Sequence, residues 1–240
     1  MPRVPSSGFK DHQSSWGHAM IKPMVFVMLL CSLSANGGTW ERIDHNAIRF
    51  RGDIQQGDFE RLEAILSPDD RILYLDSKGG DVEVGVRLAS HLLPRQLTVI
   101  VDGICASSCA NYLFTAGLNK EIRRGWVGFH GNLTALMAQD WHEVARKFKE
   151  EGGLSDQQIS ELHARFMALA GIEQKYLERA GVDQALFERT QKPDKGMGDG
   201  VPYHFLVPRP ETFERYGIRN VLGRQDLSWG AELNLNKIHD

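Results

Sequence analysis

The sequence predicts an α/β fold in which parallel strands alternate with helices. Residues 71–76 and 97–101 are short and almost continuously apolar, which is typical of strands in a parallel sheet covered on both faces. Between them, residues 82–93 repeat apolar side chains at helical spacing, and Pro94 ends this helix. A further strand-like run at 126–129 completes the order strand–helix–strand–helix–strand. That order predicts right-handed crossovers between parallel strands.

The first 35 residues are expected to be a leader that precedes the folded domain at residues 36–240. Lys22 stands before the apolar run 24–30, and small residues follow up to Ala35. This order is typical of a secretory signal peptide, whose start would be Met20, so we expect export to the periplasm. One alternative is a buried N-terminal helix. Another is membrane anchoring by an uncleaved leader, although the apolar run is too short to span a bilayer.

The remaining elements follow from the same periodicity rules. Residues 47–50 alternate like a strand, and residues 58–66 place their apolar side chains on one helix face. Asp102-Gly103 is predicted to be a turn. The later elements expected are a helix over 107–116, an almost wholly helical region over 140–180 interrupted at Gly152-Gly153 and Gly171, a loop over 192–200, a strand over 203–207 and a helix over 212–216.

The composition excludes several classes of protein. A chain of 240 residues suits one α/β domain with small additions. Because 42% of the residues are hydrophobic, 25% are charged and the net charge is -3, a disordered, collagen-like or nucleic-acid-binding chain is disfavoured. No segment resembles an ATP-binding P-loop, and no cofactor or metal is expected.

Three chemically useful features are predicted at the carboxyl ends of the strands, where open α/β sheets carry their functional residues. Gly79-Gly80 follows the first buried strand, Ser107 follows the second, and His130 ends the third. Taken singly, each has an ordinary structural explanation as a turn, a helix N-cap or a structural histidine. Together they contain the groups that nucleophilic catalysis needs.

The chemistry of these residues assigns a role to each. A serine hydroxyl becomes an effective nucleophile when a base takes its proton, and histidine is the usual base near neutral pH. The tetrahedral intermediate needs backbone N–H donors, which a glycine loop and a helix start can supply. We therefore predict Ser107 as the nucleophile, His130 as the base, and the amides of Gly80 and Ser108 as oxyanion donors. Ser108 is the rival nucleophile.

This part of the sequence resembles the proteolytic subunit of the Clp protease and, more widely, the Clp/crotonase superfamily. Residues 76–81 are similar to the family's N-S-P-G-G loop, residues 103–108 to its G-x-A-A-S nucleophile segment, and residues 127–130 to its histidine strand. Residues 49–54 resemble its first strand. The resemblance covers about residues 48–130 well and the helical tail loosely. It implies a Clp/crotonase-like parallel sheet with helical crossovers and a helical C-terminal region, assembled as a homo-oligomer.

The sequence departs from the family pattern at two positions. The family's catalytic aspartate shortly precedes a Y-G-L segment, here residues 216–218, and alignment from that end puts Tyr203 in its place. Asp199 is the candidate replacement, Asp194 in the same loop is an alternative, and a Ser–His dyad without an acid is a third. Lys78 replaces the proline of the family's glycine loop.

The meaning of the cysteines depends on the compartment. Cys31 would leave with the leader, so Cys105 and Cys109 would remain as an even pair in an oxidising environment. Their spacing inside one regular helix does not orient two sulfurs well for bonding, whereas the geometry is easier if Cys105 precedes the helix. A disulfide and two buried thiols both stay open. The pair flanks the serine segment as it does in exported Clp-like proteins, which the chain resembles most.

The expected function is that of an exported serine peptidase or amidase that acts on peptides or unfolded polypeptide. No ATPase partner is expected, because ATP is absent outside the cytoplasm. Two other functions stay open. A crotonase-type enzyme would use the fold on an acyl-thioester without needing Ser107 and His130, and a degenerate oligomeric scaffold would explain the missing acid. Trp126, Trp141 and Phe166 are expected in the core or in an interface.

Overall fold

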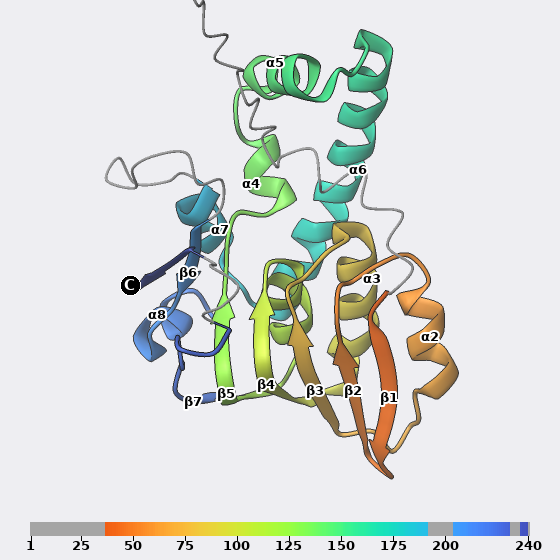
Figure 1. Cartoon of the computed structure of the whole chain (residues 1–240), viewed down its shortest axis with the longest axis vertical. Helices are drawn as coiled ribbons and strands as arrows, with labels where there is room; N and C mark the ends of the chain where they lie inside the picture. The colour runs from red at the N-terminus through yellow and green to blue at the C-terminus, as the bar shows by residue number, and fades with distance from the viewer. Residues whose placement is uncertain (1–36, 192–203, 231–235, 240) are drawn as a thin grey trace, which may run out of the picture.

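The apolar and alternating segments of the sequence assemble into a six-stranded sheet (Figure 1). The computed structural model describes residues 37–191, 204–230 and 236–239. The strands of this sheet are β1 (Thr39–Asp44), β2 (Ala47–Arg51), β3 (Ile72–Ser77), β4 (Thr98–Ala106), β5 (Asn119–Gly128) and β7 (Val221–Gly223). Their order is β1-β2-β3-β4-β5-β7, with β1 antiparallel to β2 and every other neighbouring pair parallel. The predicted α/β class is confirmed, as a mixed and mostly parallel sheet.

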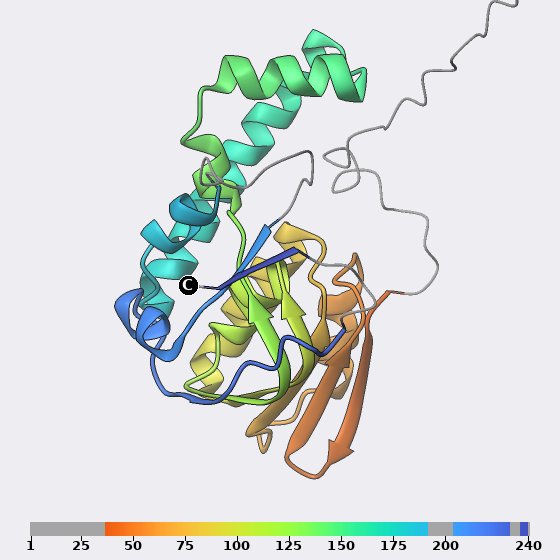
Figure 2. The same cartoon turned by 60° about the vertical axis from the view of Figure 1, so that its left-hand side comes forward.

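Helical crossovers connect the parallel strands, as the sequence predicts. They are α2 (Asp58–Ile65), α3 (Val82–Leu92) with the 3-10 turn η2 (Leu93–Arg95), and the π-helical turn η3 (Cys109–Phe114). Helix α3 begins where the Asp81 carboxylate accepts a hydrogen bond from the Val84 amide, which satisfies one of the free N–H groups at the helix start. Helix α3 and η3 pack against each other behind the sheet (Figures 1 and 2).

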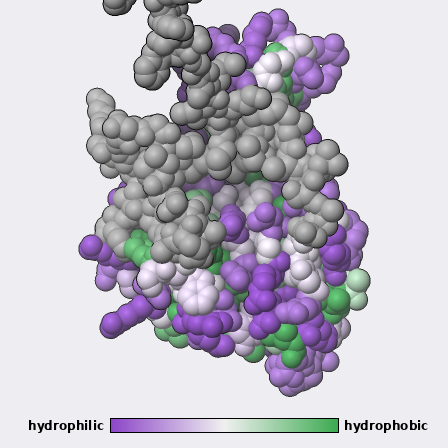
Figure 3. All heavy atoms as spheres, viewed as in Figure 1, coloured by the Kyte–Doolittle hydropathy of each residue, from purple (hydrophilic) through white to green (hydrophobic). Residues whose placement is uncertain are grey.

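The two faces of the sheet are covered differently. Side chains of β3 and β4 that point to the helices, such as Leu75 and Val101, are fully buried in the main apolar core. The other face is largely hydrophilic where it is visible in Figure 3, and it carries ion pairs such as Arg49–Glu41 at 2.8 Å. The expectation of a strand covered on both faces does not hold for residues 71–76, because their side chains alternate between buried and half-buried.

Strand β4 is longer than predicted, and this extension carries Ser107 to the edge of the sheet. Asp102-Gly103 is not a turn: both residues stay paired with β5, after a register shift between Val101 and Asp102. Gly103 is needed there because a Cβ would lie 2.2 Å from Oδ1 of Asp76, which itself accepts a hydrogen bond from the Ile104 amide. Glycine therefore marks a close approach inside a strand here rather than its end.

A helical region follows β5, as predicted, and most of it lies beyond the carboxyl ends of the strands (Figures 1 and 2). Gly153 ends α5 in a left-handed conformation, which glycine adopts readily. Gly171 does not interrupt α6, contrary to expectation. A capping box formed by Ser155 and Gln158 starts this long helix, and the cost of about 1 kcal/mol for an internal glycine is small beside its packing. The helices are α4 (Leu133–Met137), α5 (Trp141–Gly152), α6 (Asp156–Ala180) and α7 (Ala185–Gln191).

The C-terminal segment adds β6 (His204–Val207), α8 (Pro210–Arg215) and β8 (Asn236–His239). The predicted strand and helix in this part are confirmed to within two residues. Strands β6 and β8 form a separate parallel pair, and an antiparallel bridge between Phe129 and Leu206 joins β6 to the end of β5. This bridge places β6 beside the predicted histidine strand. The predicted loop at 192–200 lies outside the described residues.

The predicted leader also lies outside the described residues, together with its start at Met20 and its cysteine, Cys31. Among the residues that are described, no helix combines the length and the apolar character needed to cross a membrane. Trp126 is fully buried in a small cluster with Ile104 and Phe205, as its core assignment predicts, whereas Trp141 and Phe166 are half-buried.

Candidate active site

Ser107 lies on the turn that joins the end of β4 to η3. Its backbone φ is 55°, a left-handed conformation that residues other than glycine seldom adopt. Two backbone hydrogen bonds hold this turn: the Ser107 amide donates to the Gly128 carbonyl at 3.1 Å, and the Ser107 carbonyl accepts from the Asn111 amide at 2.8 Å. The residue is only 5% exposed. A strand-to-helix turn of this kind presents one side chain outside the regular structure.

His130 follows β5 and faces this side chain. Its Nε2 lies 2.6 Å from Oγ of Ser107, which is hydrogen-bonding distance. The ring of Phe205 on β6 packs against the imidazole at 5.5 Å between centroids, so β6 helps to fix the orientation of the ring. The sequence did not reveal Phe205, since only the fold brings β6 next to the end of β5.

The surroundings of His130 keep its imidazole neutral. Burial lowers the pKa of His130 from 6.5 to about 4, and a hydrogen bond to the backbone of Gly131 opposes part of that shift. A neutral imidazole with Nε2 facing a hydroxyl can accept its proton. The geometry and the pKa of this histidine are therefore compatible with its role as a base throughout the neutral range.

Gly79 brings the glycine loop into contact with the serine turn. A Cβ at Gly79 would lie 2.7 Å from the Ala106 carbonyl oxygen, from Cβ of Ser107 and from the Ser108 amide nitrogen. Its φ of 97° is also one that side chains disfavour. The absence of a side chain at this position lets the glycine loop pack directly against the serine turn. The neighbouring Lys78 is exposed.

The backbone N–H groups of Gly80 and Ser108, the two predicted oxyanion donors, each point opposite to the carbonyl that precedes them. In a trans peptide the N–H points opposite to the preceding C=O. The Gly79 carbonyl accepts from the Ile54 amide on the β2 side, so the Gly80 N–H faces the β4 side, where Ser107 lies. The Ser107 carbonyl points along η3, so the Ser108 N–H points out of the start of that turn. Neither amide donates a hydrogen bond to another described residue.

The Ser108 hydroxyl is engaged elsewhere. It donates a hydrogen bond of 2.8 Å to the Gly80 carbonyl, which ties the start of η3 to the glycine loop. The hydrogen bond from a hydroxyl to His130 is made by Ser107. This arrangement favours Ser107 over Ser108 as the nucleophile and gives Ser108 a structural role in addition to its amide.

Cys105 and Cys109 form a disulfide that closes around the serine turn. Cys105 is the penultimate residue of β4 and Cys109 opens η3, so Cys105 does precede the helical turn. Their Cα atoms are 5.2 Å apart, within the usual range for a disulfide. Ser107 and Ser108 lie inside the small ring that this bond closes, and both sulfur-bearing residues are fully buried.

Asp199 and the alternative Asp194 both lie in the stretch outside the described residues. Asn111 reaches the backbone next to His130 through a long contact of 3.5 Å from Nδ2 to the Gly131 carbonyl, and the Gln191 side chain also lies against Gly131. The structure thus brings together Ser107, His130 and the predicted oxyanion amides.

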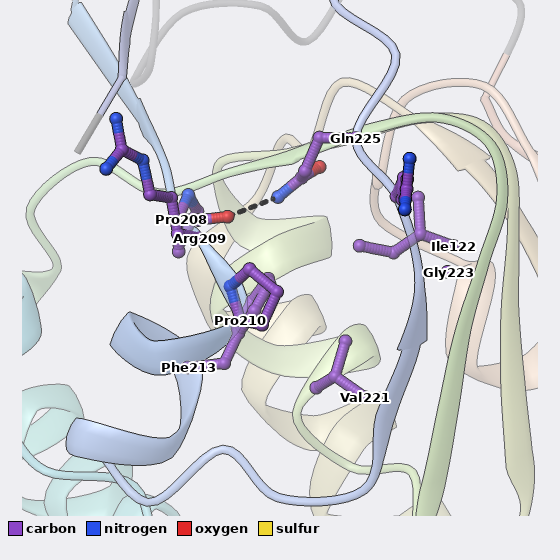
Figure 4. A pocket seen from close by; sticks show the side chains of 9 residues that line it. Ile122, Pro208, Arg209, Pro210, Phe213, Val221, Gly223 and Gln225 are labelled. Atoms are coloured by element: carbon purple, nitrogen blue, oxygen red, sulfur yellow. Dashed lines mark hydrogen bonds between the residues drawn. The ribbon is translucent and has the colours of Figure 1, made fainter.

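A separate pocket is lined by residues of the C-terminal segment and by Ile122 of β5. Its volume is about 550 Å³, and it lies between β5, β7 and α8 (Figure 4). Apolar side chains form much of its wall, and the Gln225 side chain donates to the Pro208 carbonyl across it at 3.0 Å. Neither Ser107 nor His130 lines this pocket, so it gives no direct indication of the substrate that would reach the serine.

Comparison with known proteins adds no assignment. No protein-family model matches the chain, and the search of curated proteins gives no match either.

Proposed function

We propose that the chain is an exported serine peptidase or amidase with a Clp/crotonase-like fold. The single observation that carries the proposal is the 2.6 Å hydrogen bond between Nε2 of His130 and Oγ of Ser107. The left-handed serine turn, the contact at Gly79 and the two free amides support it. The order of these features along the chain also follows the family pattern that the sequence resembles.

The proposed reaction is acyl transfer through Ser107. As Oγ of Ser107 attacks a carbonyl carbon, its proton moves to Nε2 of His130. The negative charge that develops on the carbonyl oxygen is stabilised by the N–H groups of Gly80 and Ser108. The imidazolium then returns the proton to the leaving amine, and an acyl-enzyme remains. Attack by water, with His130 again as the base, releases the acid and regenerates the serine.

The proposed compartment is the periplasm, or an equivalent oxidising space. A leader-like sequence at residues 1–35 and a disulfide between Cys105 and Cys109 both support it. In such a compartment no ATP-driven unfoldase would deliver substrate. We therefore infer that the substrates are peptides or already unfolded polypeptide, and that the enzyme acts as a homo-oligomer, as the family resemblance implies.

Hydrolysis of unfolded polypeptide tests the proposal. We expect the mature chain to cleave unfolded casein and blocked peptide amides without nucleotide, with turnover measured by release of free amines. Ser107→Ala should lower the rate at least about a thousandfold, because the nucleophile is lost. Ser160→Ala is the matched control, since Ser160 is an exposed serine on α6, remote in sequence from the dyad.

Each other outcome points to another function. If Ser107 reacts with a fluorophosphonate but no amide is cleaved, the chain is a hydrolase of another substrate class. If turnover of an acyl-thioester survives Ser107→Ala, the crotonase-type reaction is favoured. If Ser107 is inert toward both reagents and substrates in the folded chain, the proposal is wrong and a scaffold role replaces it.

A further inference from the structure

A buried carboxylate on α6 connects the two segments that carry Ser107 and His130. Glu173 is fully buried, and among the described residues it forms no ion pair with a lysine, arginine or histidine. A carboxylate in such a place is costly unless hydrogen-bond donors surround it. The donors it has found come from two different parts of the chain.

The first donor belongs to η3, the helical turn that follows Ser107. The Tyr112 hydroxyl donates to Oε1 of Glu173, and Tyr112 lies in η3, five residues after Ser107. One turn further along α6, the Tyr176 hydroxyl donates to the Tyr112 carbonyl at 2.7 Å and also contacts Oγ1 of Thr115 at 2.7 Å. Two side chains of α6 therefore hold η3, one through the Tyr112 hydroxyl and the other through the Tyr112 backbone carbonyl.

The other donors belong to the segment that follows His130. Oε2 of Glu173 accepts from the Thr134 amide at 2.7 Å and from the Thr134 hydroxyl at 2.6 Å, and the Leu133 amide approaches Oε1 at 3.4 Å. Only three residues separate His130 from Thr134 along the chain. One carboxylate thus contacts both segments that flank the dyad, and it does so from a third element.

We propose that Glu173 is a positioning residue that fixes η3, which follows Ser107, relative to the segment after His130. This inference rests on the proposed function, because it concerns the reactivity of Ser107. A carboxylate suits the role since it only accepts hydrogen bonds, and every group aimed at it is a donor. Displacement of either segment moves Oγ of Ser107 relative to Nε2 of His130, and small errors of this kind slow proton transfer and attack.

The isosteric change Glu173→Gln tests the role with little change in shape. The change removes the negative charge that strengthens both connections, and the new NH₂ group requires the Tyr112 or the Thr134 hydroxyl to turn and accept, so both connections are weakened. We expect the maximal rate of inactivation by a fluorophosphonate, measured on folded full-length chain, to fall at least tenfold, while the reagent concentration at half-maximal rate is unchanged. A fall in rate without a change in apparent affinity indicates displaced catalytic groups rather than a blocked site.

A matched control separates positioning from stability. Asp70 is also a buried carboxylate, held by the Ser67 amide at 2.7 Å and by Arg42 at 2.7 Å, but it lies in the turn before β3, at the amino ends of the parallel strands and away from the serine turn. Asp70→Asn should lower the unfolding free energy and leave the inactivation rate of the folded chain unchanged. Unfolding is followed in parallel by circular dichroism for every variant.

Gentler variants keep the proposal testable if Glu173→Gln does not fold. Tyr112→Phe removes only the connection to η3, and Thr134→Val removes one hydroxyl from the other side. Each should slow inactivation, and Thr134→Ser should restore the rate that Thr134→Val loses. In the double variant Glu173→Gln/Tyr112→Phe the two effects should be less than additive, because they act on one contact.

The outcomes distinguish this inference from the proposed function. If unmodified chain is not labelled at Ser107, the proposed function fails first. If the unmodified chain is labelled and folded Glu173→Gln, or folded Tyr112→Phe in its place, is labelled at the same rate, Glu173 serves stability alone and the inference is overturned. A loss of rate in Asp70→Asn equal to that in Glu173→Gln would overturn it too.

Discussion

Ser107 shows how local backbone geometry prepares a side chain for chemistry. Its left-handed conformation costs about 1 to 2 kcal/mol for a residue with a side chain, and such a cost persists only where the surroundings enforce it. The surroundings here are a hydrogen bond to Gly128, the start of η3 and the contact with Gly79. Together they direct Oγ of Ser107 at His130.

The pH dependence of the serine's reactivity follows from the pKa of His130. Burial lowers this pKa to about 4, so the neutral and basic form of the imidazole predominates down to mildly acidic pH. We expect the rate of fluorophosphonate inactivation to be flat from pH 8 to about 5, to halve near pH 4, and to fall about tenfold for each further unit. Labelling reactions quenched at a series of times measure this rate at each pH, and circular dichroism shows that the chain stays folded. A midpoint near 6.5 would contradict the buried geometry of the ring.

A methyl group at Gly79 should disable the site. In Gly79→Ala the Cβ would meet three atoms of the serine turn at 2.7 Å on a backbone with φ of 97°. We expect labelling to slow at least about a hundredfold and the unfolding free energy to fall by about 2 kcal/mol. Gly153→Ala is the control: its φ is 67° but nothing lies within 4 Å, so stability should fall while labelling continues. Equal labelling of both variants would show that the contact at Gly79 is not required.

The sequence identified residues whose role depends on local motifs and missed those that depend on packing. Gly80, Ser107 and His130 follow strands, and the sheet topology brings such positions together. Glu173 could have been noticed, because it occupies a position in the apolar stripe of α6 between Leu169 and Tyr176, where a carboxylate is unusual. Its partners could not be predicted, since they come from elements far away in the sequence.

At the scale of elements, the turn η3 and the disulfide form one unit around the nucleophile. A π-helical turn is rare and is frequently found at functional sites. The Thr115 hydroxyl contacts the Asn111 and Tyr112 carbonyls at 2.7 and 3.0 Å, and the Tyr112 carbonyl also accepts from the Ala116 amide at 3.0 Å. The disulfide between Cys105 and Cys109 joins the first residue of this turn to β4.

Removal of the disulfide should affect both stability and reactivity. In Cys105→Ala/Cys109→Ala the unfolded chain gains the freedom of a short loop, which corresponds to about 2 kcal/mol of unfolding free energy. The serine turn also loses its closure, so we expect labelling of Ser107 to slow about tenfold in protein that is still folded. Urea unfolding and labelling kinetics measure the two effects. A loss of stability with an unchanged labelling rate would limit the bond to a structural role.

The elements themselves were predictable where periodicity is strong. Strands β2 and β3, the first half of β4, and helices α2 and α3 follow from apolar runs and helical spacing. Strand β5 begins at Asn119, whereas only its end was predicted, at 126–129, because residues 120–124 are mostly charged and give no apolar run. The extension of β4 through Gly103 was not predictable, because a glycine read as a turn proved to accommodate the Asp76 side chain. Strand β1, which pairs antiparallel with β2, has charged side chains at three of its six positions and gave no apolar run.

At the scale of the whole molecule, the expected assembly remains a prediction. Large apolar side chains stay exposed on α6, with Met167 54% and Ile172 55% exposed, and such side chains are often covered by a partner chain. We expect native mass spectrometry of the purified mature chain to show a homo-oligomer, and Met167→Lys/Ile172→Lys to shift it toward monomer. A chain that is monomeric at micromolar concentration would count against close kinship with the Clp family.

Site-resolved covalent labelling tests the central claim, that His130 activates Ser107, most directly. Purified chain is treated with a fluorophosphonate, digested, and mapped by mass spectrometry. The account predicts one modified residue, Ser107, with no label in Ser107→Ala, at least about a hundredfold slower labelling in His130→Ala, and normal labelling in Ser160→Ala. Label on Ser108, label that persists at full rate in His130→Ala, or folded chain that does not react would contradict it.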